Sequence, residues 1–259
     1  MEVAGLAISI ASLASLFDTA IDAFRYLQVG KALGVDVQSA CLQLDSAQLR
    51  LSRWGQAVGV GTATETVVSL QATSFPERDV RLAETLLGHI VNLFHQAEKE
   101  SMRLRESQSP AGTTDLEANL SPESLALHKR VLDICRRRQH GTSLINKAKW
   151  AIYGREHLLS LVEEVGKSVN NLLELFPAAQ QAQRKLCDLE IETIRGLSSW
   201  PDFLEIAKTQ DKMLADIAAS LPGKSVSNTY HSWNNHDSTK VMHQIAGDQI
   251  VHGGQTFSF

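Results

Sequence analysis

An unbroken helical stripe of apolar residues in the third quarter of the chain constrains the fold most strongly. Between residues 158 and 177, apolar side chains recur at alternating steps of four and three residues, and the pattern stops at Pro177. This spacing places them on one face of an α-helix, and a face this apolar must pack against other helices. The stripe consists of Leu158, Val162, Val165, Val169, Leu172 and Phe176. The spacing therefore predicts a bundle of packed helices.

Two similar stripes occur in the first half of the chain. One consists of Val37, Cys41, Leu44, Ala47, Leu51 and Trp54, and the other of Ala83, Leu86, Leu87, Ile90, Val91 and Phe94. Pro76, "SPES" (Ser121–Ser124) and "SSWPDF" (Ser198–Phe203) indicate helix boundaries. No strong alternating strand pattern occurs before Pro222. Since 43% of the 259 residues are apolar, the chain can bury a sizeable core. We therefore predict one all-α, multi-helix globular domain over residues 1–221.

The N-terminus carries an uncharged run. The fifteen residues Val3–Phe17 ("VAGLAISIASLASLF") are apolar or small and lie between Glu2 and Asp18. A secretory signal begins with a basic region, which is missing here, so export is not expected. A membrane span needs roughly 20 apolar residues, so the run is short unless it extends past Asp18 and Asp22 to residue 27. A buried first helix and a conditional membrane segment are both open interpretations. The side chains that would enter the membrane are Val3, Leu6, Ile8, Ile10, Leu13, Leu16 and Phe17.

The composition changes after "LPGKS" (Leu221–Ser225). Residues 223–259 contain no Leu, Glu, Arg or Pro, and their four charged side chains sum to zero. Polar residues between Ser225 and Thr239 predict a flexible linker. Beyond it, "KVMHQIA" and "QIVH" flank Gly247-Asp248, a dipeptide that can form a turn. We therefore assign residues 222–259 to a linker and a β-prone tail.

This tail has the composition of an amyloid-forming segment. Low net charge, absence of proline, amides that can form ladders and β-branched side chains favour a cross-β stack, in which each chain pairs its backbone with the next. Charged gatekeeper residues are sparse. The alternative is an unstructured C-terminal tail. The residues of the predicted amyloid motif are Val241, Gln244, Ile245, Gly247, Gln249, Ile250, Val251, Gly253, Gln255 and Phe257.

The sequence contains no recognisable catalytic motif. HExxH, GxSxG and GxGxxG are all absent. The three cysteines, Cys41, Cys135 and Cys187, are far apart, with no CxxC pair and no histidine at zinc spacing, which favours buried thiols in a reducing cytosol. A net charge of −4 offers no general attraction for nucleic acid. We therefore expect a protein that is not an enzyme and that has no metal, cofactor or nucleic-acid partner.

Several segments closely resemble one fungal protein family. "LRLSRWGQAV" (Leu49–Val58), within the longer match Phe17–Val60, and "AKWAIYGREHLLSLVEEVGKSVNNLLELFP" (Ala148–Pro177) are similar to the HeLo domain. This domain is the globular part of the heterokaryon-incompatibility prion proteins, the HET-s/HET-S family. The resemblance covers roughly residues 1–221. The tail differs, because the best-known members carry two Asn- and Gly-rich repeats, whereas Gln244–Gly247 is more similar to short amyloid motifs such as the RHIM core.

The resemblance implies a membrane-disrupting (pore-forming) effector of programmed cell death. In that family the C-terminal motif self-assembles after templating by a matching motif on a prion protein or on a receptor, commonly of nucleotide-binding type. Fibril formation then releases the N-terminal apolar segment, here residues 3–27, to membrane lipid. The implied location is cytoplasmic at rest and the plasma membrane on activation. Because Asp18 and Asp22 make insertion of a single helix costly, we expect several copies around a shared aqueous lumen.

A second hypothesis comes from a different functional class. The chain could be a soluble helical adaptor or an inactive prion antagonist that recruits partners through its C-terminal motif. Its helical domain would then never enter a membrane. Fibrils that form without membrane leakage would distinguish this hypothesis from the first.

Overall fold

The computed structural model describes five stretches of the chain. The backbone is described for residues 2–30, 36–61, 76–107, 113–140 and 150–221, and the side chains for 12–30, 37–61, 76–103, 114–140 and 150–221. The predicted linker and amyloid motif, residues 222–259, lie outside these ranges.

Helices dominate the described residues, as the sequence predicts. The α-helices are α1 (Glu2–Arg25), α2 (Asp36–Val58), α3 (Glu77–Ser107), α4 (Pro122–Arg137), α5 (Arg155–Glu174), α6 (Gln180–Ile194), α7 (Trp200–Gln210) and α8 (Lys212–Ser220). Two short 3-10 helices are η1 (Leu116–Asn119) and η2 (Pro177–Ala179), and three short strands are β1 (Leu27–Gly30), β2 (Thr113–Asp115) and β3 (Trp150–Ile152).

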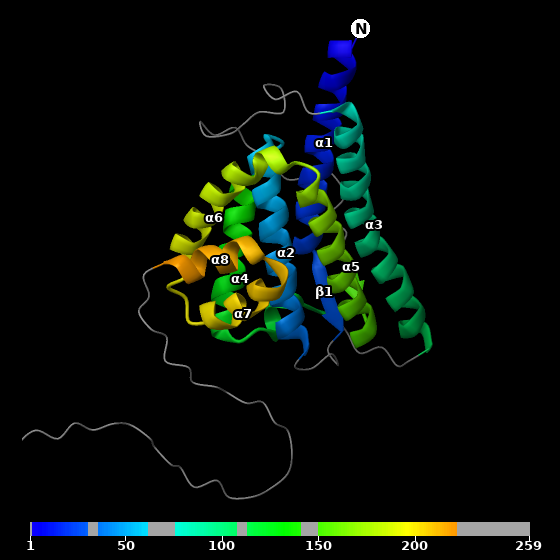
Figure 1. Ribbon diagram of the computed structural model, residues 1–259. Helices are drawn as coiled ribbons and strands as arrows, with labels where there is room; N and C mark the ends of the chain where they lie inside the picture. Colours follow the sequence, from blue (N-terminus) through cyan, green and yellow to red (C-terminus); the bar gives the residue numbers. More distant parts are fainter. Residues whose placement is uncertain (1, 31–35, 62–75, 108–112, 141–149, 222–259) are drawn as a thin grey trace, which may run out of the picture. The chain divides into compact units, whose positions relative to one another are not determined.

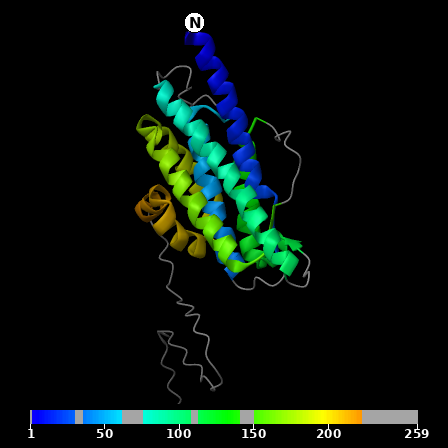
Figure 2. The same cartoon turned by 90° about the vertical axis from the view of Figure 1, so that its right-hand side faces the viewer.

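Helix α2 lies at the centre of this helical unit. The long helices α1 and α5 pack on one flank of it, and α3 packs on α1 and α5 (Figures 1 and 2). Helices α4, α6 and α7 pack on its other flank, and α8 packs on α6 and α7. Helix α2 therefore links the two flanks of the helical unit.

The core is built from the predicted stripes. Every residue of the 158–176 stripe is buried, and so is every residue of the stripe from Val37 to Trp54. In the stripe on α3, Leu86 and Val91 are only partly buried, whereas its other four members are buried. Helical spacing therefore identified the faces that α2, α3 and α5 turn to the core.

Proline and serine residues begin or end the helices where the sequence indicated. The Ser121 hydroxyl accepts a hydrogen bond from the Ser124 backbone N–H (3.2 Å) and caps α4, whose first residue is Pro122. Pro201 lies in the first turn of α7, and Pro177 follows the end of α5. These positions suit proline, because backbone N–H groups in the first helical turn have no partner within the helix.

Three short strands accompany the helices, although the sequence shows no strong alternating strand pattern before Pro222. Strand β1 pairs antiparallel with β2 and parallel with β3, giving the order β2-β1-β3. The strands have only three or four residues, too few to show a recognisable alternation. The apolar segment that was expected to reach Leu27 accordingly ends as a helix at Arg25, and Leu27 opens β1. The sheet therefore fixes the C-terminal end of α1.

Candidate functional site

The second half of α1 is packed deeply into the helical unit. Of the predicted membrane-entering residues, Leu13 and Phe17 are fully buried and Leu16 is partly buried. Val3, Leu6, Ile8 and Ile10 lie on the first half of the helix, outside the residues whose side chains are described. In both views the first turns of α1 extend beyond the ends of α3 and α5 (Figures 1 and 2). We call the buried residues Leu13, Phe17, Ala20, Ile21 and Phe24 the α1 seat.

Phe17 occupies a notch in α2 that only glycine can provide. A Cβ atom at Gly55 would lie 2.1 Å from Phe17 Cε2 and 2.5 Å from its Cζ. The Phe17 ring also packs against Trp54, with ring centroids 6.5 Å apart, and the Trp54 ring in turn lies 5.7 Å from the ring of Phe176, which precedes η2. Because aromatic side chains bury a large apolar area, this contact is a principal attachment of α1 to α2.

Amide side chains attach α1 through polar contacts. Gln139 Nε2 donates to the backbone carbonyl of Asp18 (3.1 Å) and to Asp22 Oδ1 (3.1 Å), and Gln48 Nε2 donates to the carbonyl of Ile21 (3.1 Å). Asp22 also lies 3.4 Å from Arg25 on the next turn. These bonds satisfy polar groups that would be costly to bury alone.

The fold changes the titration of the Asp18 carboxyl group on α1. Burial raises the pKa of Asp18 to about 6, although the backbone N–H and the charge of His140 oppose the shift. The His140 N–H lies 3.4 Å from Asp18 Oδ1, and its ring Nδ1 lies 3.8 Å from Oδ2. A carboxyl group with this pKa becomes largely neutral at mildly acidic pH, which reduces the cost of moving it into an apolar environment.

A buried network of charges lies on the opposite flank of α2. Arg53 Nε lies 2.9 Å from Glu190 of α6, and Arg53 Nη2 lies 2.7 Å from Asp211, the residue between α7 and α8. Arg138, one residue beyond α4, donates to Glu190 (2.6 Å) and to the Ser52 hydroxyl (3.0 Å). Two cations and two anions therefore compensate one another in the core. We call Arg53, Arg138, Glu190 and Asp211 the Arg53 network.

Asp211 has two roles at the end of the helical unit. It caps α8 by accepting a hydrogen bond from the Leu214 N–H (3.2 Å), while it also pairs with Arg53. Burial alone would raise the pKa of Asp211, but the charge and hydrogen bonds of Arg53 outweigh burial and hold the pKa below its ordinary value. Asp211 therefore stays ionised and holds α7 and α8 against α2.

Sequence reasoning did not identify the Arg53 network. Arg53 is separated from Glu190 by 137 residues and from Asp211 by 158, so no local motif joins them. The available signal was the position of Arg53 beside Trp54, on a helix whose apolar stripe predicted burial. The predicted amyloid residues from Val241 to Phe257 lie outside the described residues. Among the helices described, none is long and apolar enough to cross a membrane.

Comparison with known proteins gives the family. The family model HeLo, described as prion-inhibition and propagation, matches residues 5–201. The chain belongs to the HeLo family. Heterokaryon incompatibility protein s of Podospora anserina is 32% identical over 219 residues, which cover 83% of this chain and 73% of that protein. Heterokaryon incompatibility protein S of the same species is 32% identical over 210 residues, 80% of this chain and 70% of that protein.

Solved structures give the same fold. The structure of the HET-s N-terminal domain superposes with a TM-score of 0.66 at 30% sequence identity, covering 80% of this chain and 95% of that domain. A doubly substituted variant of that domain gives the same TM-score at 32% identity. The all-α HeLo fold predicted from the resemblance is therefore confirmed for the helical unit of this chain.

Proposed function

We propose that this HeLo protein is an amyloid-triggered, membrane-disrupting effector of heterokaryon-incompatibility-type cell death, and that it is not an enzyme. In the resting state the buried side chains of the α1 seat anchor the N-terminal helix in the core of the helical unit. A fibril templated on the motif within residues 241–257 then loosens α7 and α8, and α1 is released to the plasma membrane. The templating partner is a prion protein or a receptor, for example of nucleotide-binding type, that carries a matching motif.

One observation carries this proposal: a single turn of α2 contacts both the C-terminal helices and α1. Arg53 pairs with Asp211 at the junction of α7 and α8, Trp54 packs on Phe17, and Gly55 provides the notch for the Phe17 ring. These three α2 residues are consecutive. A displacement of α7 and α8 that removes Asp211 from Arg53 therefore acts within one turn of the Phe17 contact, which supports coupling between the tail and α1.

The chemistry of α1 supports assembly of several copies at the membrane. The residues Val3 to Phe17 carry no charge, but Asp18 and Asp22 follow within the next turns. Charged side chains are costly at the bilayer centre unless they face water or one another. Several α1 helices gathered by one fibril could turn these carboxyl groups to a shared aqueous lumen.

The test is seeded dye release from liposomes. Full-length protein would be added with and without preformed fibrils of a peptide spanning residues 223–259, next to a variant that lacks residues 2–11. This deletion retains Leu13, Phe17 and the rest of the α1 seat, so the helical unit should still fold, which circular dichroism and urea unfolding would check. A larger deletion to residue 17 would remove two buried core residues and confound fold with function.

Three outcomes separate the hypotheses. Release that requires both the fibril seed and residues 2–11 supports the membrane-disrupting mechanism. Fibrils that form without release, at any protein concentration tested, overturn the membrane step and favour the adaptor or prion antagonist. Failure of the 223–259 peptide to form β-rich fibrils overturns the proposed trigger.

A further inference from the structure

Three side chains with metal-binding atoms meet in the core between α2 and α4. Cys41 and Asp45 lie four residues apart on one face of α2, and His128 approaches from α4. Cys41 Sγ lies 3.6 Å from His128 Nδ1 and 3.8 Å from Asp45 Oδ2, while His128 Nδ1 lies 2.7 Å from Asp45 Oδ1. All three residues are buried, with exposed fractions of 0, 2 and 6% for Cys41, Asp45 and His128. Three side chains that can each bind a metal ion therefore lie together in a small buried volume.

The three donor types can neutralise a divalent cation. A Cys41 thiolate and an Asp45 carboxylate each contribute one negative charge, and a His128 imidazole contributes none. A divalent ion bound by them therefore gives a buried site with no net charge.

The spacing of the three ligand atoms is close to that of a tetrahedral zinc site. With Zn–S near ~2.3 Å and Zn–N near ~2.05 Å, tetrahedral angles place sulfur and nitrogen ~3.6 Å apart and nitrogen and oxygen ~3.3 Å apart. The observed separation of 3.6 Å between Cys41 Sγ and His128 Nδ1 matches the first requirement, and Asp45 Oδ2 lies 3.8 Å from the same sulfur. The His128–Asp45 separation of 2.7 Å is a hydrogen bond, and a rotation of the Asp45 carboxylate that widens it by ~0.6 Å would admit the ion.

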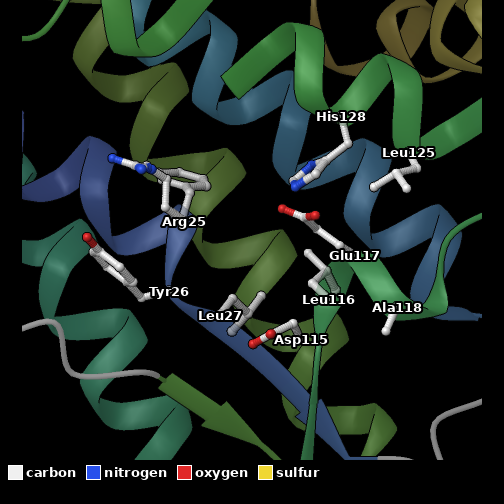
Figure 3. A pocket seen from close by; sticks show the side chains of 10 residues that line it. Arg25, Tyr26, Leu27, Asp115, Leu116, Glu117, Ala118, Leu125 and His128 are labelled. Atoms are coloured by element: carbon white, nitrogen blue, oxygen red, sulfur yellow. The ribbon is translucent and has the colours of Figure 1, made fainter. Parts of the chain in front are cut away.

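A fourth ligand can reach the site from one side. His128 lines a cavity of about 540 Å³ between the end of α1, β1, η1 and α4. In Figure 3 the Glu117 carboxylate points toward the His128 ring across this cavity. Glu117 is exposed and lies outside the group of ligand atoms that are within 4.8 Å of one another. A water molecule that enters from this cavity can therefore complete a four-coordinate site.

We propose that Cys41, Asp45 and His128 bind a thiophilic divalent transition metal, of which Zn²⁺ fits the mixed sulfur, nitrogen and oxygen donors best. The sequence did not predict this site, because His128 lies 87 residues after Cys41 and no zinc-binding motif spans that separation. The site joins α2 to α4 and borders the end of α1, so a bound ion stabilises the resting helical unit. Its existence does not depend on the proposed membrane function.

The experiment is a cobalt titration of the metal-free full-length protein. Co²⁺ in place of Zn²⁺ should give a thiolate-to-cobalt charge-transfer band that saturates at one equivalent, with release of protons as the ion binds. Only a cysteine ligand gives this band, so metal bound by the tail histidines does not contribute. Zn²⁺ should displace Co²⁺ and, at a hundredfold excess over its Kd, raise Tm by about 5 °C.

Variants locate the site. Cys41→Ala should abolish the band, and His128→Gln and Asp45→Asn, which preserve side-chain volume, should each weaken binding by at least tenfold. Cys135→Ala is the matched control, because Cys135 is equally buried but lies outside the cluster, and this variant should bind as the wild type does. Absence of the band in the wild-type protein, or a band that survives Cys41→Ala in a folded variant, would overturn the proposal.

Discussion

The Gly55 notch allows the attachment of α1 to be weakened with one methyl group. In Gly55→Ala the new Cβ would lie 2.1, 2.5 and 2.7 Å from three ring atoms of Phe17. Carbon atoms in contact lie ~3.5–4.0 Å apart, so the ring must move by more than ~1 Å. Phe17 is fully buried beside Trp54, so its ring can move only within the core.

The expected magnitude follows from two opposing effects. Overpacking of a buried site costs ~1–3 kcal/mol, and the displacement required here corresponds to the upper end of that range. Replacing a glycine within a helix by alanine stabilises the helix by ~1 kcal/mol. Gly55→Ala should therefore lower the free energy of unfolding by ~2 kcal/mol, measured by urea denaturation. Hydrogen exchange should increase mainly in α1.

The chain contains matched controls for this substitution. Gly88 in α3 and Gly166 in α5 are also helical, and a Cβ at either position meets nothing within 4 Å. Gly88→Ala and Gly166→Ala should each stabilise the protein by up to ~1 kcal/mol. In a double-mutant cycle, Phe17→Leu removes the two closest ring atoms and should recover ~1 kcal/mol of the loss in Gly55→Ala. If Gly55→Ala is as stable as Gly88→Ala, the notch does not hold α1 and the reasoning fails.

Further predictions concern the charged groups on both flanks of α2. Asp211→Ala leaves Arg53 buried with one fewer anion and should cost ~3 kcal/mol in urea denaturation, whereas Asp188→Ala, an exposed change on α6, should cost less than ~0.5 kcal/mol. Because the folded-state pKa of Asp211 lies below its ordinary value of 3.8, its contribution to the stability of the fold is complete above pH 3.8 and is lost on further acidification. Asp211→Asn should remove this dependence of stability on acidic pH. Asp18 behaves oppositely, because its folded-state pKa is raised from 3.8 to about 6, so its contribution to stability falls as the pH rises between these values. Asp18→Asn should flatten a Tm-versus-pH profile across that interval and raise Tm at pH ~7, and an unchanged profile would contradict the assignment. Seeded dye release by the wild-type protein should be greater below pH ~6 than above it. Release by Asp18→Asn should be the same below and above pH ~6, because an amide carries no charge.

Local periodicity predicted the helices because each stripe lies within one element. The stripes on α2 and α5 could be recognised from each helix alone, because an apolar face must be covered whichever helix packs on it. The polar residues of the core could not be predicted in the same way. Arginine is a residue type usually found at the surface. Only the ion pairs with Glu190 and Asp211, far along the chain, offset the cost of burying the Arg53 charge.

The sequence analysis missed the sheet and the cluster of Cys41, Asp45 and His128 for related reasons. Strand β1 is set by its pairing with β2 and β3, which lie more than 80 residues away, rather than by its own alternation. Cys41 was identified as a core residue from the α2 stripe, but its neighbours Asp45 and His128 gave no signal at zinc spacing. Residue type and local spacing therefore identify faces, whereas sites that join distant elements require the fold.

The two flanks of α2 differ in how they resist opening, and this difference determines the order of events in the proposed activation. The Arg53 network consists of buried charges, whose mutual attraction offsets a large desolvation cost, so water that enters as α7 and α8 move away restores much of the lost free energy. The Phe17 contact has no such compensation, because exposure of its ring to water is unfavourable throughout. When a fibril exerts force on the tail, α7 and α8 should therefore separate from α2 first. Helix α1 should follow only when the turn of α2 that carries Arg53, Trp54 and Gly55 has shifted. Mutations in the Arg53 network should accordingly lower the seed concentration needed for dye release, whereas Gly55→Ala should raise release even without seed.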